Sequence, residues 1–459
     1  SPICNQSFAN GVFPDRNKVA KVIPIHKKGS SKDVNNYRPI SLLSIFSKIM
    51  EKLMATRLNT FLEVHSIIYP NQFGFRSGCS TTHSLISISE TINQTIERKK
   101  FGLGVFIDLK KAFDTVNHEI LLKKLEHYGI RSVALSWFRS YLTERKQYVS
   151  LNGADSDIMS ITCGVPQGSV LGPILFLLYI NDLPNISDKL KFFLFADDTN
   201  IYLEDKNLEN LQNIMNTELE KLYEWLSINR LSLNISKTNF VVFHAINKPK
   251  HPINIVINEQ SVDEVTSVKY LGILLDSHMS FKTHIDELTK KISRSIGILY
   301  KLRPFVTAEI LTNVYYAIVY PFLLYGIAVW GNAGKTVLSP ILVLQKKFVR
   351  MATSNDAFPL IAGPLPHTPP LFYKLKVLTI SDIYNLQLGK FVFESLNNIG
   401  PSNRIVTFQR VSEIHNYATR QATQGNIYIN SARTTSYGLK SIQIQGAKFW
   451  ETIPAQIKE

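Results

Sequence analysis

Cysteine is scarce in this chain of 459 residues, which contains only three: Cys4, Cys79 and Cys163. They are far apart in the sequence, odd in number, and no two of them form a Cys-x-x-Cys pair. This distribution argues against a disulfide framework and against a zinc knuckle built from cysteine pairs. A reducing compartment is therefore expected.

Long uncharged apolar runs are also few. The best candidate, residues 314–330, is slightly short of the roughly 20 residues that a bilayer span needs, and it contains Pro321 and several tyrosines. We expect buried helices broken near Pro321 instead of a membrane span. The first residues lack the charged and apolar regions of a signal peptide. Because the chain starts at Ser1 and not at Met, we expect it to be part of something longer.

Acidic residues are outnumbered by basic ones. The chain has 36 Asp and Glu against 51 Lys and Arg, which gives a formal net charge of +15 at pH 7. Such a surplus favours a polyanionic partner, with nucleic acid first and an anionic membrane second; an ordinary basic surface is the alternative. With 45% hydrophobic and 19% charged residues, the composition is that of a folded protein. Its length allows about two to four domains.

What the chain does contain is a pair of adjacent acidic residues in an apolar, aromatic-rich stretch. Asp197 and Asp198 lie between residues 192–195 and 201–203, two runs that are predicted to be buried strands. Acidic groups at the ends of buried strands are desolvated, which is unfavourable unless a cation binds them. Mg²⁺ prefers carboxylate oxygens, so a metal site is one interpretation. A simple hairpin turn is the other, because Asp is common in turns.

A third acidic residue strengthens the metal interpretation. Asp108 ends another predicted buried strand, residues 103–108. If this strand neighbours the one before Asp197, three carboxylates meet at one edge of a sheet, where like charges raise each other's pKa. Such a cluster could bind two Mg²⁺ ions about 4 Å apart, which would activate a 3′-hydroxyl and stabilise a leaving pyrophosphate.

Basic residues near the N-terminus could contact phosphates. Lys27, Lys28 and Arg38 lie in a predicted strand–loop–strand region, residues 17–40. Arg suits bidentate phosphate contact and Lys acts as a point charge, so the three could clamp a triphosphate. Solvated surface cations are the alternative interpretation.

A second loop has glycine on both sides of a glutamine. Gln167 lies between Gly164 and Gly168. Glycine lets the backbone approach a ligand closely, and the glutamine amide could contact a base or a sugar. Taken alone, this pattern indicates only a turn.

The hydrophobic periodicity predicts an α+β fold. In residues 42–54 apolar side chains recur at helical spacing and should face the core, with Lys48, Glu51 and Lys52 on the outer face. Strands and helices interleave without regular alternation, which favours an α+β catalytic domain followed by a helical one. The remaining predicted helices are 83–98, 172–183, 207–229 and most of 281–353, and the remaining strands are 240–243, 253–257 and 267–275.

The last part of the sequence changes character. Residues 354–459 start with a proline cluster that is typical of a linker. A helix is predicted near residues 377–397, followed by a polar, irregular tail. The cluster comprises Pro359, Pro364, Pro366, Pro369 and Pro370.

Three segments in this order carry a family resemblance: FIDLKKAFD, GVPQGSVLGPILFLLYINDL and FADD resemble motifs A, B and C of reverse transcriptases. Upstream, VIPIHKKG, NYRPISLL and QFGFRSGCST are similar to the fingers of non-LTR retrotransposon enzymes, especially the jockey-like group. Downstream, LSLNISKT resembles motif D, VKYLGILLD resembles the primer-grip region, and YPFLLYGIAVWG and LQKKFVRMA resemble the thumb. The resemblance implies a right-hand polymerase with fingers and palm in residues 1–278, a helical thumb in 279–353, and a C-terminal extension of unknown role in 354–459.

The resemblance also implies roles for acidic and neighbouring residues. Asp108, Asp197 and Asp198 match the catalytic, metal-binding triad, which would hold two Mg²⁺ ions, with Mn²⁺ possible. Phe113 matches the steric gate that excludes a 2′-hydroxyl. Lys237 matches a lysine proposed to protonate pyrophosphate, although an exposed lysine after a strand is more often structural.

Further matches concern substrate and primer. Lys27 or Lys28 and Arg38 match the family's triphosphate contacts. The next pair, Gln167 and Gly168, matches the motif B loop under the incoming nucleotide. Primer contact is expected at Tyr270, Leu271 and Gly272, with core packing as an equal alternative.

The implied activity is RNA-templated DNA synthesis from a primer 3′-hydroxyl, in target-primed reverse transcription. The implied partners are template RNA, primer or target DNA and dNTPs, with no membrane. An endonuclease domain is expected to be missing from this chain, and the expected location is intracellular, in a cytoplasmic ribonucleoprotein and the nucleus.

Two alternatives remain. An RNA-dependent RNA polymerase or intron-encoded maturase is disfavoured by Phe113. A catalytically inactive, truncated or domesticated nucleic-acid-binding protein is disfavoured by the retention of all three acids.

Overall fold

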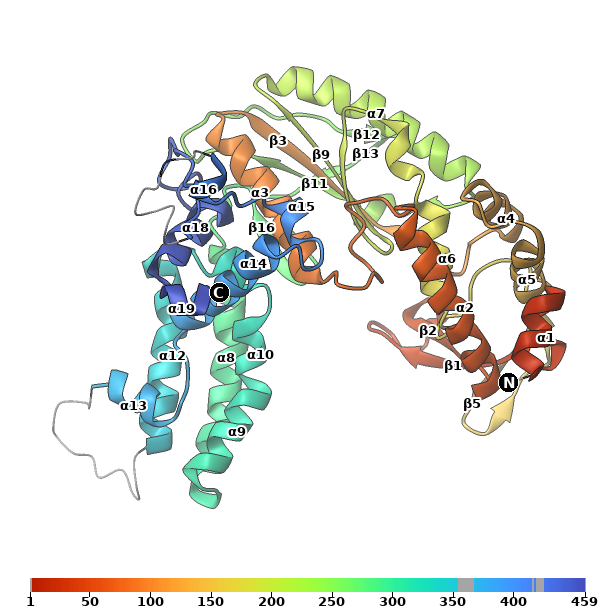
Figure 1. Ribbon diagram of the computed structural model, residues 1–459, viewed down its shortest axis with the longest axis horizontal. Coiled ribbons are helices and arrows are strands. Elements are labelled where there is room, and N and C mark those ends of the chain that lie inside the picture. Colours follow the sequence, from red (N-terminus) through yellow and green to blue (C-terminus); the bar gives the residue numbers. More distant parts are fainter. Residues whose placement is uncertain (1, 354–366, 415–416, 418–424, 459) are drawn as a thin grey trace.

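A computed structural model describes residues 2–353, 367–414, 417 and 425–458. Its elements form an arch in Figure 1, with a small sheet and helices near the N-terminus at one end. A five-stranded sheet lies in the middle, and a bundle of long helices forms the other end. The predicted α+β, right-hand architecture is thereby confirmed.

The central sheet has the strand order β14-β11-β3-β9-β8. Alternate residues of a strand point to opposite faces: Val241 and Phe243 of β11 enter one hydrophobic core, and Phe240 and Val242 enter a second. Helices α3 (Thr81–Glu97) and α7 (Leu208–Ile228) supply side chains to these two cores and so cover opposite faces. The strands are β3 (Phe101–Ile107), β8 (Lys191–Phe195), β9 (Asp198–Asp205), β11 (Asn239–Phe243) and β14 (Asp263–Glu264).

The N-terminal end of the arch is built on a second sheet. Strand β1 (Val19–His26) pairs antiparallel with β2 (Tyr37–Leu42) and parallel with β5 (Lys146–Leu151). The β1–β2 hairpin carries the predicted phosphate contacts at its tip. The helices of this end are α1 (Pro2–Asn10), α2 (Ile45–Val64), α4 (His118–His127), α5 (Ser132–Leu142) and α6 (Gly172–Ile180).

Helix α2 corrects the predicted orientation of its side chains. Met50 is buried as expected, but Phe46, Ile49 and Leu53 are 72%, 47% and 44% exposed. Glu51, expected on the outer face, is fully buried. A buried carboxylate is tolerated when hydrogen bonds satisfy it, and periodicity alone could not reveal that partners for Glu51 lie elsewhere in the chain.

Two predicted strands are also corrected. Residues 267–275 form a hairpin of β15 (Ser267–Tyr270) and β16 (Ile273–Asp276), because Leu271 and Gly272 have positive φ and turn the chain. In the predicted strand 253–257, only Val256–Ile257 is regular, as strand β12.

The other end of the arch is helical. The helices are α8 (Lys282–Leu302), α9 (Ala308–Ile318), α10 (Tyr320–Leu324), α11 (Ile327–Trp330) and α12 (Lys335–Thr353). The predicted break near Pro321 is confirmed, since α9 ends just before it. Within the described ranges, no helix is both long enough and apolar enough to cross a bilayer.

The C-terminal part packs against this bundle. The predicted helix near 377–397 is confirmed as α14 (Ile380–Leu396). The predicted irregular tail is wrong in part, because α18 (Ile442–Thr452) packs on α14 through buried side chains. Of the proline cluster, Pro359, Pro364 and Pro366 lie outside the described residues, and Pro369 and Pro370 begin α13 (Pro369–Lys374).

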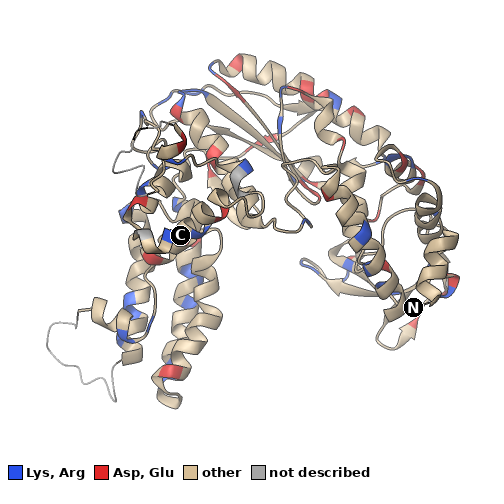
Figure 2. Ribbon diagram, in the orientation of Figure 1, with Lys and Arg blue, Asp and Glu red and all other residues tan. Residues whose placement is uncertain are grey.

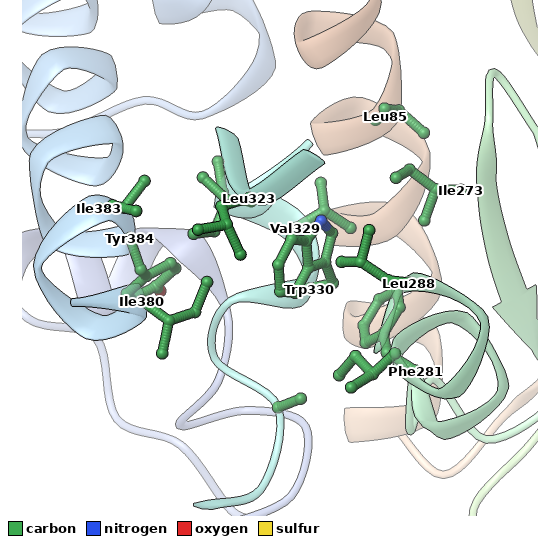
Figure 3. Close-up of a cluster of buried hydrophobic side chains, with 14 of the residues drawn as sticks. Leu85, Ile273, Phe281, Leu288, Leu323, Val329, Trp330, Ile380, Ile383 and Tyr384 are labelled. Atoms are coloured by element: carbon green, nitrogen blue, oxygen red, sulfur yellow. The ribbon is translucent and has the colours of Figure 1, made fainter. Parts of the chain in front are cut away.

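One continuous core joins α3, the helical bundle and the C-terminal part. Figure 3 shows Trp330 between Leu288 of α8 and the α14 side chains Ile380 and Tyr384. Trp330 is fully buried, and its Nε1 donates a hydrogen bond to a backbone carbonyl. Leu85 of α3 belongs to the same core. Apolar burial on this scale makes the three parts one packed unit.

Candidate active site

The site is centred on the turn between β8 and β9. Phe195 pairs with Asp198, so Ala196 and Asp197 form the tip of a tight hairpin. Ala196 adopts a left-handed conformation with φ of 55° and is buried, whereas both aspartates reach solvent. The turn therefore holds its apolar residue inward and presents two carboxylates outward.

A buried glutamine holds this turn. The Oε1 atom of Gln72 accepts hydrogen bonds from the backbone N–H groups of Ala196, at 3.0 Å, and of Gly74, at 2.9 Å. Only 2% of Gln72 is exposed. A Cβ atom on Gly74 would lie 2.3 Å from the Ala196 nitrogen, so no side chain fits there. The sequence analysis missed Gln72 as a site residue, although it stands in the QFGFRSGCST segment.

Asp108 comes from the neighbouring strand. In the antiparallel pairing of β3 with β9, Ile107 lies opposite Thr199, so Asp108 emerges beside Asp198. The side-chain amide of Asn234 donates to Asp108 Oδ2 at 2.7 Å, and the Asn234 backbone N–H donates to the Asp108 carbonyl at 2.8 Å. Asn234 was also missed; it stands in the LSLNISKT segment. Together these contacts fix the direction of the Asp108 carboxylate.

The charge of Asp108 acts on both Asp197 and Asp198. Desolvation, followed by the charges of Asp197 and Asp108, raises the pKa of Asp198 to about 6. Desolvation and the Asp108 charge also raise the pKa of Asp197. Although both side chains reach solvent, the protein surrounds them closely enough to disfavour their charged forms. The structure therefore brings together the three acids that the sequence singled out.

The donor chemistry fits a hard divalent cation. No group of three or more His, Cys, Asp or Glu side chains is ready to hold a metal ion in the part of the chain that the structure describes. Asp108, Asp197 and Asp198 nevertheless offer only oxygen donors, and a cation would compensate the desolvation and the repulsion that raise the pKa values of Asp197 and Asp198. Because Mg²⁺ commonly keeps waters or substrate phosphates as ligands, a few carboxylates can suffice.

Basic residues of the β1–β2 hairpin lower the pKa values of these aspartates. Arg38 lies opposite Ile25 in the hairpin, and Lys27 and Lys28 follow in its exposed turn. The charge of Lys27 lowers the pKa values of both Asp197 and Asp198, and that of Arg38 lowers the pKa of Asp197. Figure 2 shows basic residues at the hairpin tip, on the inner side of the arch.

Lys237 lies beside Asp108. Its Nζ atom is 3.9 Å from Asp108 Oδ2, and 62% of its side chain is exposed. At this distance and exposure the ion pair contributes little to stability.

Phe113 is held by other rings. It stacks on Phe176 with ring centroids 4.4 Å apart, and Phe75 meets it edge-on at 6.3 Å. Phe113 remains half-buried, so part of its ring faces outward. A ring fixed in this way can exclude a substituent without moving.

The Gly-flanked loop contacts strand β2 and Asp114. The Gln167 side chain donates to Asp114 Oδ1 at 3.0 Å, while the Gln167 carbonyl accepts from the Ser41 backbone N–H at 2.7 Å. Gly168 has φ of 114°, and a Cβ atom there would lie 2.7 Å from the Ser41 carbonyl oxygen. Glycine is therefore required at 168 by both conformation and space. In this structure the amide that was predicted to face a nucleotide is engaged by a carboxylate.

The predicted primer contacts divide into two kinds. Tyr270 is only 3% exposed, and its hydroxyl lies 2.5 Å from the Ser84 hydroxyl in the core. Burial raises the pKa of Tyr270 well above its usual value. Leu271 and Gly272 form the hairpin turn, where Gly272 is exposed and the Leu271 carbonyl accepts from Tyr325 at 2.6 Å. Of the three predicted contacts, Tyr270 is therefore part of the core, and Leu271 and Gly272 are accessible.

Comparisons with known proteins agree with these motifs. The family described as reverse transcriptase (RNA-dependent DNA polymerase) matches residues 25–275, which include every site residue that the sequence predicts. The RNA-directed DNA polymerase from mobile element jockey of Drosophila melanogaster is 32% identical over 76% of this chain and 39% of its own length. The probable RNA-directed DNA polymerase from transposon BS of the same organism is 33% identical, over 74% and 39%.

The chain spans about two fifths of the length of these relatives. Among solved structures, telomerase from Candida albicans in complex with a fragment of telomeric RNA aligns at a TM-score of 0.45 and 13% identity. That alignment covers 80% of this chain and 68% of the telomerase chain.

Proposed function

The chain belongs to the reverse transcriptase family, and from that premise we propose that it extends a primer 3′-hydroxyl with deoxynucleotides copied from an RNA template. The observation that supports this most is the convergence of Asp108, Asp197 and Asp198 at one edge of the central sheet. Because these carboxylates repel one another, binding of divalent cations, together with the phosphates that the cations carry, would be favourable at this edge.

The relatives suggest a narrower proposal. Their names describe RNA-directed DNA polymerases of mobile elements. We place this chain with the polymerases of non-LTR retrotransposons, in the jockey-like group, acting in target-primed reverse transcription. Its partners are then template RNA, a nicked target DNA that supplies the primer, and dNTPs, with an endonuclease elsewhere in the longer protein.

Each part of the site has a task in this reaction. Two divalent ions, Mg²⁺ or Mn²⁺, bound by the three aspartates would lower the pKa of the primer hydroxyl and neutralise the leaving pyrophosphate. Arg38 and Lys27 hold the triphosphate from the hairpin side. Asn234 keeps the Asp108 carboxylate directed into the site. Lys237, at its 3.9 Å distance from Asp108, can deliver a proton to the pyrophosphate.

The decisive experiment is primer extension on an RNA template with Mg²⁺ or Mn²⁺, comparing the parent protein with Asp197→Ala. We expect extension by the parent and a loss of at least about 100-fold in the variant, because a metal ligand contributes a few kcal/mol to the transition state. Binding of the template should survive and weaken as salt rises, since it rests on backbone cations. Unchanged extension by Asp197→Ala would overturn the proposed mechanism.

Sugar selection provides a separate test. Phe113 is clamped between Phe176 and Phe75, so its ring cannot retreat from a 2′-hydroxyl. We expect Phe113→Ala to incorporate ribonucleotides at least about tenfold more efficiently relative to deoxynucleotides, since a steric clash is worth about 1–3 kcal/mol. Competition between dNTP and rNTP on one template measures the ratio. A parent protein that already uses both equally would remove the steric-gate role.

A further inference from the structure

Helix α2 carries a carboxylate that is completely enclosed. Glu51 is 0% exposed. Its Oε2 atom accepts hydrogen bonds from the backbone N–H groups of Val170, at 2.7 Å, and Leu171, at 3.2 Å, and its Oε1 accepts from the Ser47 hydroxyl at 2.9 Å. A carboxyl group enclosed in this way needs such donors, because a buried polar atom without a hydrogen bond is unfavourable.

The two amides belong to the segment that leads into α6. The first residues of a helix have N–H groups without partners in the helix, and Leu171, the N-cap of α6, has no side-chain capping bond of its own. Glu51 supplies the missing acceptor from a helix about 120 residues earlier in the chain. Its negative charge also suits the positive end of the α6 dipole.

The same segment is fastened to the fingers a second time. The Ser41 backbone N–H donates to the Gln167 carbonyl, and Gly168 is pressed against the Ser41 carbonyl. Ser41 lies in β2, the strand that also carries Arg38. The loop at Gln167 is therefore held by β2 at its start and by α2 at its end.

We propose that Glu51 is a positioning residue that locks the loop 167–171 to the fingers, so that Arg38 and Gln167 form one rigid nucleotide-binding surface. The inference rests on the proposed function, in which these two residues contact the triphosphate and the base or sugar. Glu51 touches neither substrate nor metal. It acts through the backbone of the loop, and it selects the position of the incoming nucleotide.

A second buried carboxylate offers a matched control. Glu218 in α7 is 1% exposed and pairs with Lys189 and Lys221. It lies in an element that carries none of the proposed substrate contacts. Replacing it tests what the loss of any buried carboxylate does to stability, without touching the loop.

The experiment compares Glu51→Gln, Glu51→Met and Glu218→Met with the parent protein in primer extension and thermal unfolding. Gln can still accept from both amides, so Glu51→Gln should keep the KM for dNTP within about twofold. Glu51→Met should raise that KM about tenfold while kcat falls less than about threefold and the affinity for primer–template stays unchanged. Glu218→Met should lower the melting temperature but leave the KM for dNTP as it is.

Amide hydrogen exchange provides a readout that does not need activity. In Glu51→Asp the charge remains but the carboxylate is drawn back, so the amides of Val170 and Leu171 should exchange faster than in the parent protein. Two outcomes would show that Glu51 has only a structural role. One is unchanged exchange of the Val170 and Leu171 amides, and the other is a KM for dNTP that rises no more in Glu51→Met than in Glu218→Met. A parent protein that fails to extend primers would overturn the proposed function, while the exchange result would still decide whether Glu51 fixes the loop.

Discussion

Carboxylates serve opposite purposes in two regions of this molecule. At the edge of the central sheet, desolvation and the neighbouring charges of Asp197 and Asp108 raise the pKa of Asp198 to about 6. On helix α3, Glu97 accepts hydrogen bonds from the backbone and hydroxyl of Thr434 in the C-terminal part. Although desolvation opposes it, these bonds hold the pKa of Glu97 below its usual value.

Asp198 and Glu97 differ in whether other groups of the protein compensate their charge. At the sheet edge the carboxylates lack enough donors and cations, so they are unfavourable until something positive binds. At the junction of α3 with residues 433–438, Glu97 already has its donors and joins segments more than 300 residues apart. Removing Asp198 should therefore stabilise its region, and removing Glu97 should destabilise the junction.

The largest expected effect is at the sheet edge. Asp198→Asn should lower primer extension at least about 100-fold, as the loss of a metal ligand. The same change should stabilise the unliganded protein at pH 7 by about 1 kcal/mol after solvent screening, because a raised carboxyl pKa destabilises the fold as pH rises through about 6. Thermal unfolding at pH 5 and pH 7 measures this, and the gain should be smaller at pH 5. A variant less stable than the parent at pH 7 would contradict the expectation that the Asp198 carboxylate destabilises the unliganded protein.

An intermediate effect is expected at Gln72, which supports the acids without being one of them. Gln72→Leu leaves two buried N–H groups without an acceptor, so it should destabilise the fold by about 1–3 kcal/mol. Because the Asp197–Asp198 turn loses its support, extension should fall about tenfold or more at a temperature where the variant is folded. Full activity in a destabilised but folded variant would show that the turn holds its shape alone.

The smallest effect is expected at the junction. Glu97→Gln weakens charge-assisted hydrogen bonds and should destabilise the fold by about 1 kcal/mol at pH 7, with extension changed less than about twofold. A carboxylate whose folded pKa is lowered contributes stability above its unfolded pKa and loses it as pH falls. The difference between variant and parent should thus vanish in denaturant titrations at pH values low enough to protonate Glu97 in the folded protein. A difference that persists there would mean that the charge of Glu97 is irrelevant.

The sequence predicts the acids better than it predicts what holds them. Asp108 directly follows β3, and Asp197 and Asp198 lie at the turn between β8 and β9, so all three adjoin local apolar runs that are visible without knowing the fold. Gln72 and Asn234 were missed because their partners, the Ala196 backbone N–H and the Asp108 carboxylate, lie more than 120 residues away in the sequence. The spacing of polar residues along a sequence does not indicate which groups they contact in the folded protein.

Helix α2 and the C-terminal part illustrate the same limit. Periodicity placed Glu51 outside because it ranks residues by polarity, whereas the amides of Val170 and Leu171 draw it inside. The C-terminal part is polar and proline-rich enough to resemble a tail, yet α18 is built around Trp450, which is 4% exposed. Its apolar face is short, and the helix depends on α14 for burial.

The segment beside the catalytic turn has one more consequence. Phe73 donates its backbone N–H to the Leu194 carbonyl at 2.9 Å, and Leu194 donates to the Asn71 carbonyl at 3.0 Å. Strand β8 is the outermost strand of the central sheet, and an open edge invites pairing with another molecule. Residues 71–73 pair with Leu194 of this edge strand. Substitutions that weaken this pairing would expose unpaired backbone groups of β8 and would also disturb the aspartates. Variants here should be watched for aggregation during expression, as an effect separate from their activity.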